Sequence, residues 1–266
     1  MKASTLSDLR ERFEALIQPY FSGDHKADEA LAVKKAHTMR VCSNARRISR
    51  DLGLSGEEQR LADCTALFHD FGRFEQYRRY GTFDDMVSCN HGHLSLQQMA
   101  THGLFRLIER PERRVVAKAI AFHNALCLPD GEDEQALLFM RLLRDADKID
   151  ILNFFAGYLP GKGDAPNPAV VLGLSSDPGC SEEALASLAA GQMVDRHALR
   201  TVNDFLLLQL SWVYDINYGP SCRLLKERGH LRQLASLLPD SRPVRQAVAK
   251  AFNVLEGADA PLEVGA

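Results

Sequence analysis

The stretch ALFHDFGRFEQYRRYGTF, residues 66–83, places His69 and Asp70 side by side at the end of an apolar run. The apolar positions before this pair recur at helical spacing, which predicts a helix that buries His69 and ends at Gly72. Residues 73–89 are rich in polar and aromatic side chains and are predicted to form a loop. An ionised carboxylate in an apolar setting is costly unless a cation or a hydrogen-bond donor compensates it. Asp70 therefore needs a partner inside the fold.

The composition is that of a globular protein. The chain has 266 residues, of which 45% are hydrophobic and 25% charged, with a net charge of -3. This length allows one large domain or two small ones. The charge shows no basic excess that would favour a nucleic-acid polymer or an anionic membrane as a partner. The 6 cysteines form no CxxC pair, which argues against a zinc knuckle and a disulfide framework.

Apolar segments of the kind that direct or anchor a chain to membranes are not found. The first residues, MKASTLSDLRERFEALIQPYF, lack the continuous apolar core of a signal peptide. No later stretch reaches the roughly 18 apolar residues of a membrane span. We therefore expect a cytoplasmic protein without a membrane partner, and a homodimer fits the sequence as well as a monomer does.

Helical periodicity runs through most of the chain, and the period-two pattern of strands is almost absent, so we expect an all-α fold. Residues 1–158 are predicted to form the helical core. Residues 159–182 concentrate Pro, Gly, Ser and Asp and are predicted to form a loop or lid. Residues 183–266 are expected to add C-terminal helices, over about 183–218 and 221–257, that pack on the core.

Histidines and aspartates recur on helix faces that should be dry. His37, the pair His69 and Asp70, and the aspartates of RDADKID (residues 144–150) come from three different helices. A single buried histidine is more often a hydrogen-bonded core residue than a ligand, but several groups with buried carboxylates need a shared partner. Nitrogen and carboxylate ligands together suit Zn, Mn, Fe, Co or Ni better than Ca or Mg. One or two divalent ions, among them Mn, Fe, Co, Ni, Zn or Mg, are the expected cofactors.

The order of these residues resembles the pattern H…HD…D of the HD-domain superfamily of metal-dependent phosphohydrolases. The resemblance covers about residues 30–155 and is strongest at HDFGR and ADKID. It implies an HD-domain helical bundle in which His37, His69, Asp70 and Asp147 are the metal ligands. Asp147 is preferred to Asp145 because the family pattern ends in a small residue, an aspartate and a basic residue; helical phase leaves both open.

Two further histidines extend the resemblance. His91 and His123 fit the expanded pattern H…HD…H…H…D of members with two metals, in which the HD aspartate bridges the ions. His93 competes with His91 in NHGHLS, and His91 is preferred because it stands at the start of a helix that Asn90 is expected to cap. Packed core groups and substrate contacts are the other interpretations of His91 and His123. The segments RFEQYRRYGTFDD and QLSWVYDINY resemble a bacterial branch of the superfamily, which indicates no substrate.

The resemblance implies hydrolysis of a phosphate ester of a nucleotide or another small molecule. A divalent ion with an open coordination position lowers the pKa of bound water to about 7, and Asp70 is expected to act as both ligand and proton acceptor. Arg73 and Lys148 are the predicted cationic partners of the phosphate, because Arg73 follows Asp70 by three residues and Lys148 follows Asp147; Arg78 and Arg79 are weaker candidates. The alternatives are an HD-type diiron oxygenase and a non-catalytic sensor that binds a metal or ligand.

Overall fold

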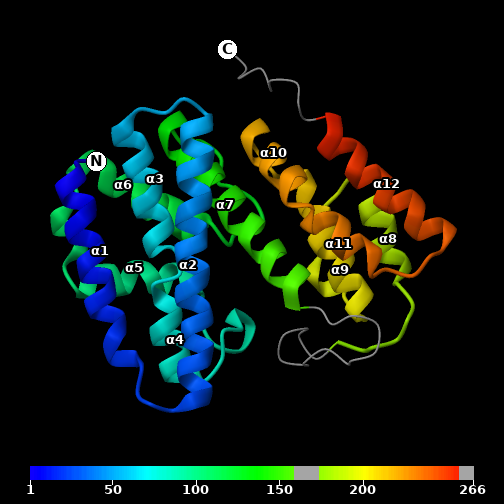
Figure 1. Ribbon diagram of the computed structural model, residues 1–266, viewed down its shortest axis with the longest axis horizontal. Coiled ribbons are helices and arrows are strands. Elements are labelled where there is room, and N and C mark those ends of the chain that lie inside the picture. The colour runs from blue at the N-terminus through cyan, green and yellow to red at the C-terminus, as the bar shows by residue number, and fades with distance from the viewer. Residues whose placement is uncertain (159–173, 258–266) are drawn as a thin grey trace. The chain divides into compact units, whose positions relative to one another are not determined.

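The computed structural model describes residues 1–158 and 174–257, and it divides the chain into two compact units at Asp150 (Figure 1). The described residues form helices joined by turns and irregular segments, with a single bridge between Ser175 and Thr201 in place of a strand. The all-α prediction is confirmed. The helices of the first unit are α1 (Ala3–Ile17), α2 (His25–Asp51), α3 (Gly56–Phe68), α4 (Gly72–Tyr80), α5 (His91–Thr101), α6 (Arg110–Phe122) and α7 (Glu134–Tyr158), whose last turns belong to the second unit.

Local signals mark where the helices of the first unit begin and end, and the predicted cap at Asn90 is confirmed. Asp24 caps α2, and Gly53, with a φ of 74°, follows its end. Ser55 and Glu58 form a capping box at the start of α3, in which each side chain bonds the other residue's backbone amide. The side chain of Asn90 accepts the amide of His93 and so caps α5. These local signals set where the helices that carry the histidines begin.

The predicted loop over residues 73–89 is wrong in its first half, because Gly72 begins α4 instead of breaking a helix. A Cβ atom at Gly72 would lie 2.5 Å from the amide nitrogen of Ser95 and 2.7 Å from the carbonyl oxygen of His91. This glycine therefore serves the close approach of α4 and α5. The residue that ends the helix is Gly81, whose φ of 65° is left-handed.

An aromatic cluster orients the segment between α3 and α4. The ring of Phe13 on α1 lies 5.8 Å from Phe68, 5.9 Å from Phe71 and 6.2 Å from Phe74, measured between centroids. All four rings are fully buried or nearly so. Because Phe68 and Phe71 flank the pair and point toward α1, His69 and Asp70 are directed to the interior between the other helices.

The second unit contains shorter helices than predicted. They are α8 (Glu182–Ala189), α9 (Val202–Ser211), α10 (Gly219–Arg228), α11 (His230–Ser236) and α12 (Arg242–Gly257). The stretch 183–218 is thus divided into two helices, and 221–257 into three. Most of the predicted loop or lid, residues 159–173, lies outside the described residues. The packing of the C-terminal helices on the core stays a prediction.

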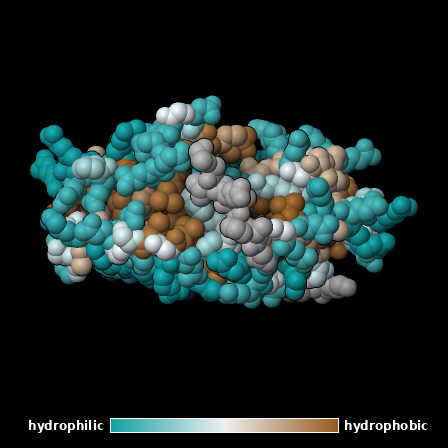
Figure 2. Space-filling view, turned by 90° about the horizontal axis from the view of Figure 1, so that it is seen from above, coloured by the Kyte–Doolittle hydropathy of each residue, from teal (hydrophilic) through white to brown (hydrophobic). Residues whose placement is uncertain are grey.

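Hydrophilic side chains cover most of the face shown in Figure 2, with hydrophobic ones between them in a few patches. This is the surface expected of helices that bury one apolar stripe each. Across the described ranges, none of the helices combines the length and the apolar character that a membrane span requires.

Candidate metal centre

Within the described part of the chain, six histidine and aspartate side chains from five segments lie close enough to share metal ions. The ligand atoms form three overlapping groups, and within each group they lie within 4.8 Å of one another. The six residues are those that the sequence singled out: His37 on α2, His69 and Asp70 in the turn between α3 and α4, His91 at the start of α5, His123 after α6, and Asp147 on α7.

The ring nitrogens Nε2 of the four histidines converge. The Nε2 atoms of His37 and His69 lie 3.3 Å apart, and those of His91 and His123 lie 2.9 Å apart. All four rings are buried, with His69 completely enclosed. A pair of imidazole nitrogens at such distances needs a proton or a cation between them, since two lone pairs repel each other.

The other ring nitrogen, Nδ1, is held by an acceptor in every case. His69 Nδ1 donates to the carbonyl of Ala66 and His123 Nδ1 to that of Ile120, each at 2.7 Å. His37 Nδ1 donates to the carboxylate of Asp150 at 2.7 Å, and His91 Nδ1 to that of Asp85 at 2.6 Å; these four contacts together place the proton on Nδ1 and direct the Nε2 lone pair to the centre. Metal-binding histidines have this arrangement.

Asp147 shows most directly that a cation fits here. Its Oδ1 atom is buried and accepts no hydrogen bond, although it lies 3.1 Å from His37 Nε2 and 3.7 Å from His69 Nε2. A carboxylate oxygen among imidazole nitrogens is costly unless a proton on one of the rings or a bound cation compensates it. A divalent cation bound by these atoms would satisfy the oxygen and the nitrogens together.

Asp70 stands between the two pairs of histidines. Its Oδ2 lies 3.6 Å from His37 Nε2 and 3.8 Å from His69 Nε2, whereas its Oδ1 lies 3.3 Å from His91 Nε2. The two oxygens therefore face two different ligand groups. This is the position that a bridging carboxylate needs when two cations lie side by side.

The comparison with protein families agrees with this geometry. Residues 35–152, which contain all six of these side chains, match the sequence profile of the HD domain. Residues 35–152 form an HD domain. HD domains bind divalent metals and belong to a superfamily of metal-dependent hydrolases. No curated protein and no solved structure matches the chain.

The sequence left two choices of ligand open, His91 or His93 and Asp145 or Asp147, and the two members of each pair lie in different surroundings. His91 is buried at the centre, whereas His93 is exposed on the opposite side of α5. Asp147 lies in the ligand cluster, whereas Asp145 is fully buried but is not among the clustered groups. Helical phase could not separate the two aspartates, because both faces of α7 are buried in this unit.

Burial controls the protonation of three of the four histidines. It lowers the pKa of His69 and His91, and it lowers the pKa of His123 to about 3, so these rings are neutral at pH 7. Burial also acts on His37, but the carboxylates of Asp147 and Asp150 outweigh it and raise the pKa of His37 to about 9. Without a metal, a proton on His37 therefore supplies part of the charge that the cluster requires.

Two cationic side chains flank the shared carboxylate. Lys34 Nζ lies 3.1 Å from Asp70 Oδ2, and Arg73 Nε lies 3.4 Å from Asp70 Oδ1. Burial raises the pKa of Asp70, but Lys34, His69 and Arg73 outweigh it and hold this pKa well below its usual range. Asp70 is therefore ionised and available as a ligand at neutral pH.

The other predicted cationic partners lie in different surroundings. Lys148 is buried on α7 beside Asp147, with 9% of its surface exposed. Arg78 and Arg79 both pair with the carboxylate of Glu75, at 2.6 and 2.5 Å, and so are engaged on α4. Arg73 remains the arginine of this segment that reaches the cluster.

Sequence reasoning missed three residues of the centre, Lys34, Asp85 and Asp150. Lys34 precedes His37 by three residues and Asp150 follows Asp147 by three, so helical spacing placed both on the ligand faces. Asp85 carried no comparable signal, because it lies in an irregular segment whose path the sequence does not specify.

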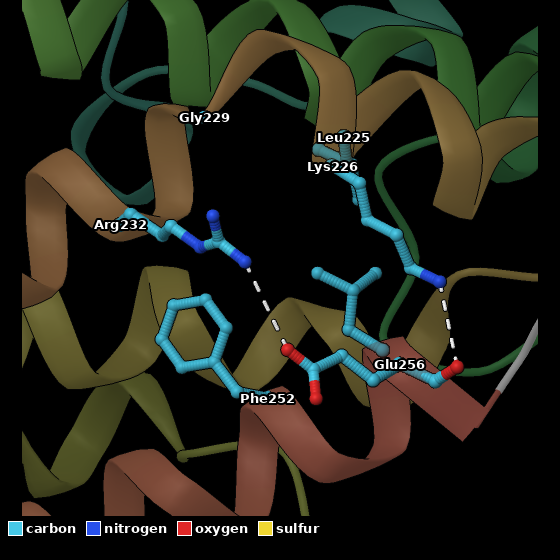
Figure 3. A pocket seen from close by; sticks show the side chains of 7 residues that line it. Leu225, Lys226, Gly229, Arg232, Phe252 and Glu256 are labelled. Atoms are coloured by element: carbon cyan, nitrogen blue, oxygen red, sulfur yellow. Dashed lines mark hydrogen bonds and ion pairs between the residues drawn. The ribbon is translucent and has the colours of Figure 1, made fainter.

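A small cavity in the second unit offers no comparable site (Figure 3). Leu225, Phe252 and Leu255 line it together with an ion pair of 3.8 Å between Arg232 and Glu256. Its free volume of about 10 Å³ is at the lower limit for a single water molecule.

Proposed function

We propose that this chain hydrolyses a phosphate ester of a nucleotide or another small molecule with the help of one or two divalent cations. The observation that carries the proposal is the unpaired, buried Oδ1 of Asp147 among imidazole nitrogens whose Nδ1 atoms are all fixed. The HD domain supports the broader class, metal-dependent hydrolysis. The phosphate ester is the finer part of the proposal.

The residues divide between two cation positions. His37, His69, Asp70 and Asp147 would hold the first cation, and His91, His123 and the second oxygen of Asp70 would hold the second. A bound divalent cation supplies positive charge that polarises a phosphoryl oxygen and lowers the pKa of a water molecule.

The chain's own residues supply the remaining chemistry. Asp70 is ionised and lies at the middle of the cluster, where it can take the proton of the attacking water. The side chains of Asp147 and Lys34 are 14% and 21% exposed, whereas that of His69 is enclosed, so the cluster reaches solvent on the side of Lys34 and Asp147. A phosphate that enters there meets Lys34 directly. Arg73 and Lys148 are proposed to neutralise its other oxygens.

The test combines metal analysis with a substrate panel. The metal-free full-length protein is loaded with Mn²⁺, Co²⁺, Ni²⁺, Zn²⁺, Fe²⁺ or Mg²⁺ and assayed for hydrolysis of nucleotides, sugar phosphates and phosphodiesters, in air and without it. We expect metal-dependent hydrolysis that His69→Ala and Asp70→Ala abolish together with metal retention, while His93→Ala, on the exposed side of α5, keeps both.

Two results would contradict the proposal. Full metal occupancy in both His69→Ala and Asp70→Ala would remove the ligand assignment. Iron-dependent oxygen uptake without hydrolysis of any phosphate ester would replace hydrolysis by oxygenase chemistry on the same ligands.

A further inference from the structure

His37 and His91 both donate to a carboxylate, and the two carboxylates lie in very different surroundings. Asp150, which bonds His37, lies on α7, is completely buried, and is clamped by Arg40 through contacts of 2.7 and 3.0 Å. Asp85, which bonds His91, lies in the segment between α4 and α5, and its side chain is 25% exposed. The first cation position thus rests on two long helices, and the second on a connecting segment.

Asp85 joins four donor side chains at the edge of the second position, and its Oδ2 also accepts the backbone amide of His91 at 3.4 Å. Its Oδ2 accepts His91 Nδ1 at 2.6 Å and the amide of Asn124 at 3.3 Å. Its Oδ1 accepts Arg73 Nη1 at 2.8 Å and the amide of Gln76 at 2.9 Å. One carboxylate therefore sets the orientation of His91 and the position of the Arg73 guanidinium together.

Arg73 faces the atoms that the second cation would use. Its Nη2 lies 3.4 Å from His91 Nε2, and its Nε lies 3.4 Å from Asp70 Oδ1. The guanidinium carries a positive charge spread over a rigid, planar group. Because Gln76, the carbonyl of Phe83 and Asp85 all accept from its Nη1, Arg73 cannot move away without loss of these bonds.

The cationic side chain beside the first position is held less firmly than Arg73. Lys34 also approaches Asp70, but its flexible stem is partly exposed and can turn toward solvent. Both histidines of the first position also face a second carboxylate, because Asp147 Oδ1 lies 3.1 Å from His37 Nε2 and 3.7 Å from His69 Nε2. Asp147 is grouped with His123 as well, but not with His91. At the second position, the carboxylate ligand is one oxygen of the shared Asp70, and the fixed side chain of Arg73 lies beside it.

We propose that Asp85 is the positioning residue of the second cation position and that Arg73 opposes cation binding there, so that the second cation binds more weakly than the first. The inference rests on the metal centre of the proposed function but not on hydrolysis. Occupancy of the second position then depends on how the segment between α4 and α5 holds Asp85.

The experiment is a Mn²⁺ titration of the metal-free full-length protein by calorimetry, with bound ions counted by elemental analysis. We expect two binding steps. Asp85→Asn should weaken the second step by about 10- to 100-fold, the usual effect of removing a residue that orients a ligand, and leave the first step in place. Asp84→Asn makes the same change of charge one residue earlier in the segment and should leave both steps unchanged.

Substitution of Arg73 should act in the opposite direction. Arg73→Gln removes a fixed charge beside the second cation and should tighten the second step by about tenfold, because a unit charge repels a nearby divalent cation even at the dielectric constant of water. Arg73→Lys keeps the charge and should not tighten it. Circular dichroism of each variant shows whether the helices are retained.

Several outcomes would overturn the inference. They are equal weakening of both steps by Asp85→Asn, no change of either step in that variant, or no tightening in Arg73→Gln. A single ion in the unaltered protein that remains single in Arg73→Gln would overturn it as well. Hydrolysis is not part of the readout, so a protein that binds Mn²⁺ as expected but releases no phosphate would contradict the proposed function alone.

Discussion

At the scale of single residues, the four histidines are fixed by two kinds of acceptor. His69 and His123 each follow the end of a helix and donate to the carbonyl three residues earlier, where the last helical carbonyls have no backbone partner. His37 and His91 donate to carboxylates instead. The carbonyl contacts are local and come with the helix ends, whereas the carboxylate contacts depend on residues far away or in irregular segments.

The raised pKa of His37 predicts a proton release. Its pKa of about 9 means that the metal-free protein carries a proton on this ring at pH 7.5, and a cation must displace that proton to reach Nε2. We expect about one proton to leave with the first Mn²⁺ at pH 7.5 and none well above pH 9. Calorimetry in two buffers of different ionisation enthalpy measures the number.

The other three histidines, His69, His91 and His123, serve as the internal control for this prediction. Burial lowers their pKa values, so they bind as neutral rings and release no proton. A first binding step without any proton release at pH 7.5 would contradict the assignment of His37 as the protonated ligand.

Lys34 is expected to contact the phosphate. Lys34→Met keeps the length of the apolar stem but removes the charge at the open side of the cluster. We expect kcat/KM for a phosphate ester to fall about 10- to 100-fold, the cost of one hydrogen bond to a charged group, without loss of bound metal. Steady-state kinetics and metal analysis check both parts.

Lys35→Met is the matched control. Lys35 is the next residue of α2 and pairs with Glu14 near the surface, at 2.5 Å. An equal loss of activity in the two variants would show that Lys34 acts through the stability of α2 and not through the substrate.

At the scale of elements, two glycines let three helices approach closely at the centre. A Cβ atom on Gly72 of α4 would meet the backbone of α5, and one on Gly92 of α5 would lie 2.8 Å from the carbonyl oxygen of Ile120 on α6. His91 lies between these two contacts. The distance between the two pairs of histidines therefore depends on the absence of a side chain at Gly72 and Gly92 as much as on the ligands themselves.

Gly72→Ala tests this packing. The added methyl group meets backbone atoms that cannot turn away, so we expect a loss of stability of about 1–3 kcal/mol, as for other overpacked interiors. Displacement of α5 should also weaken metal binding through His91. Thermal unfolding and Mn²⁺ titration measure the two effects.

Gly157→Ala provides the comparison, because among the described residues no atom beyond its neighbours in the helix lies within 4 Å of a Cβ at that position of α7. There the gain in helix propensity should leave stability unchanged or raise it by up to about 1 kcal/mol. A Gly72→Ala variant as stable as Gly157→Ala would contradict the close-packing role of Gly72.

At the scale of the whole molecule, the candidate centre connects helices that are distant in the sequence. Its six side chains extend from His37 to Asp147 and involve α2, α5 and α7, as well as the ends of α3 and α6. Without a cation, the same groups bring the Oδ1 atom of Asp147 and closely spaced imidazole nitrogens together in the interior. Metal binding should therefore stabilise the first unit as a whole.

Metal removal is predicted to lower the melting temperature. A ligand that binds only the folded state adds about 2.7 kcal/mol at a concentration 100 times its Kd. We expect the circular-dichroism transition to shift upward by several degrees when Mn²⁺ is added to the chelator-treated protein. His69→Ala should show no such shift, and an equal shift in that variant would place the stabilising ion elsewhere.

The sequence by itself determined the helical fold and much of the centre. Helical periodicity predicted the all-α architecture, and the cap residue Asn90 predicted where one of the helices begins. The six clustered side chains also stood out, because polar groups on apolar faces are costly and their spacing matches the HD pattern. Periodicity and caps are encoded locally, in residues that lie within a few turns of one another, and the order of the ligand residues can be read along the chain.

Only the tertiary structure placed Asp147, and not Asp145, among the clustered side chains and brought Lys34, Asp85 and Asp150 into the centre. It also showed that Gly72 begins a helix, because the reason for this glycine is the backbone of α5. In each case the deciding neighbour is distant in the sequence or lies on another element. A side chain's contacts across the interior depend on how helices pack, and periodicity specifies which face is buried but not what that face meets.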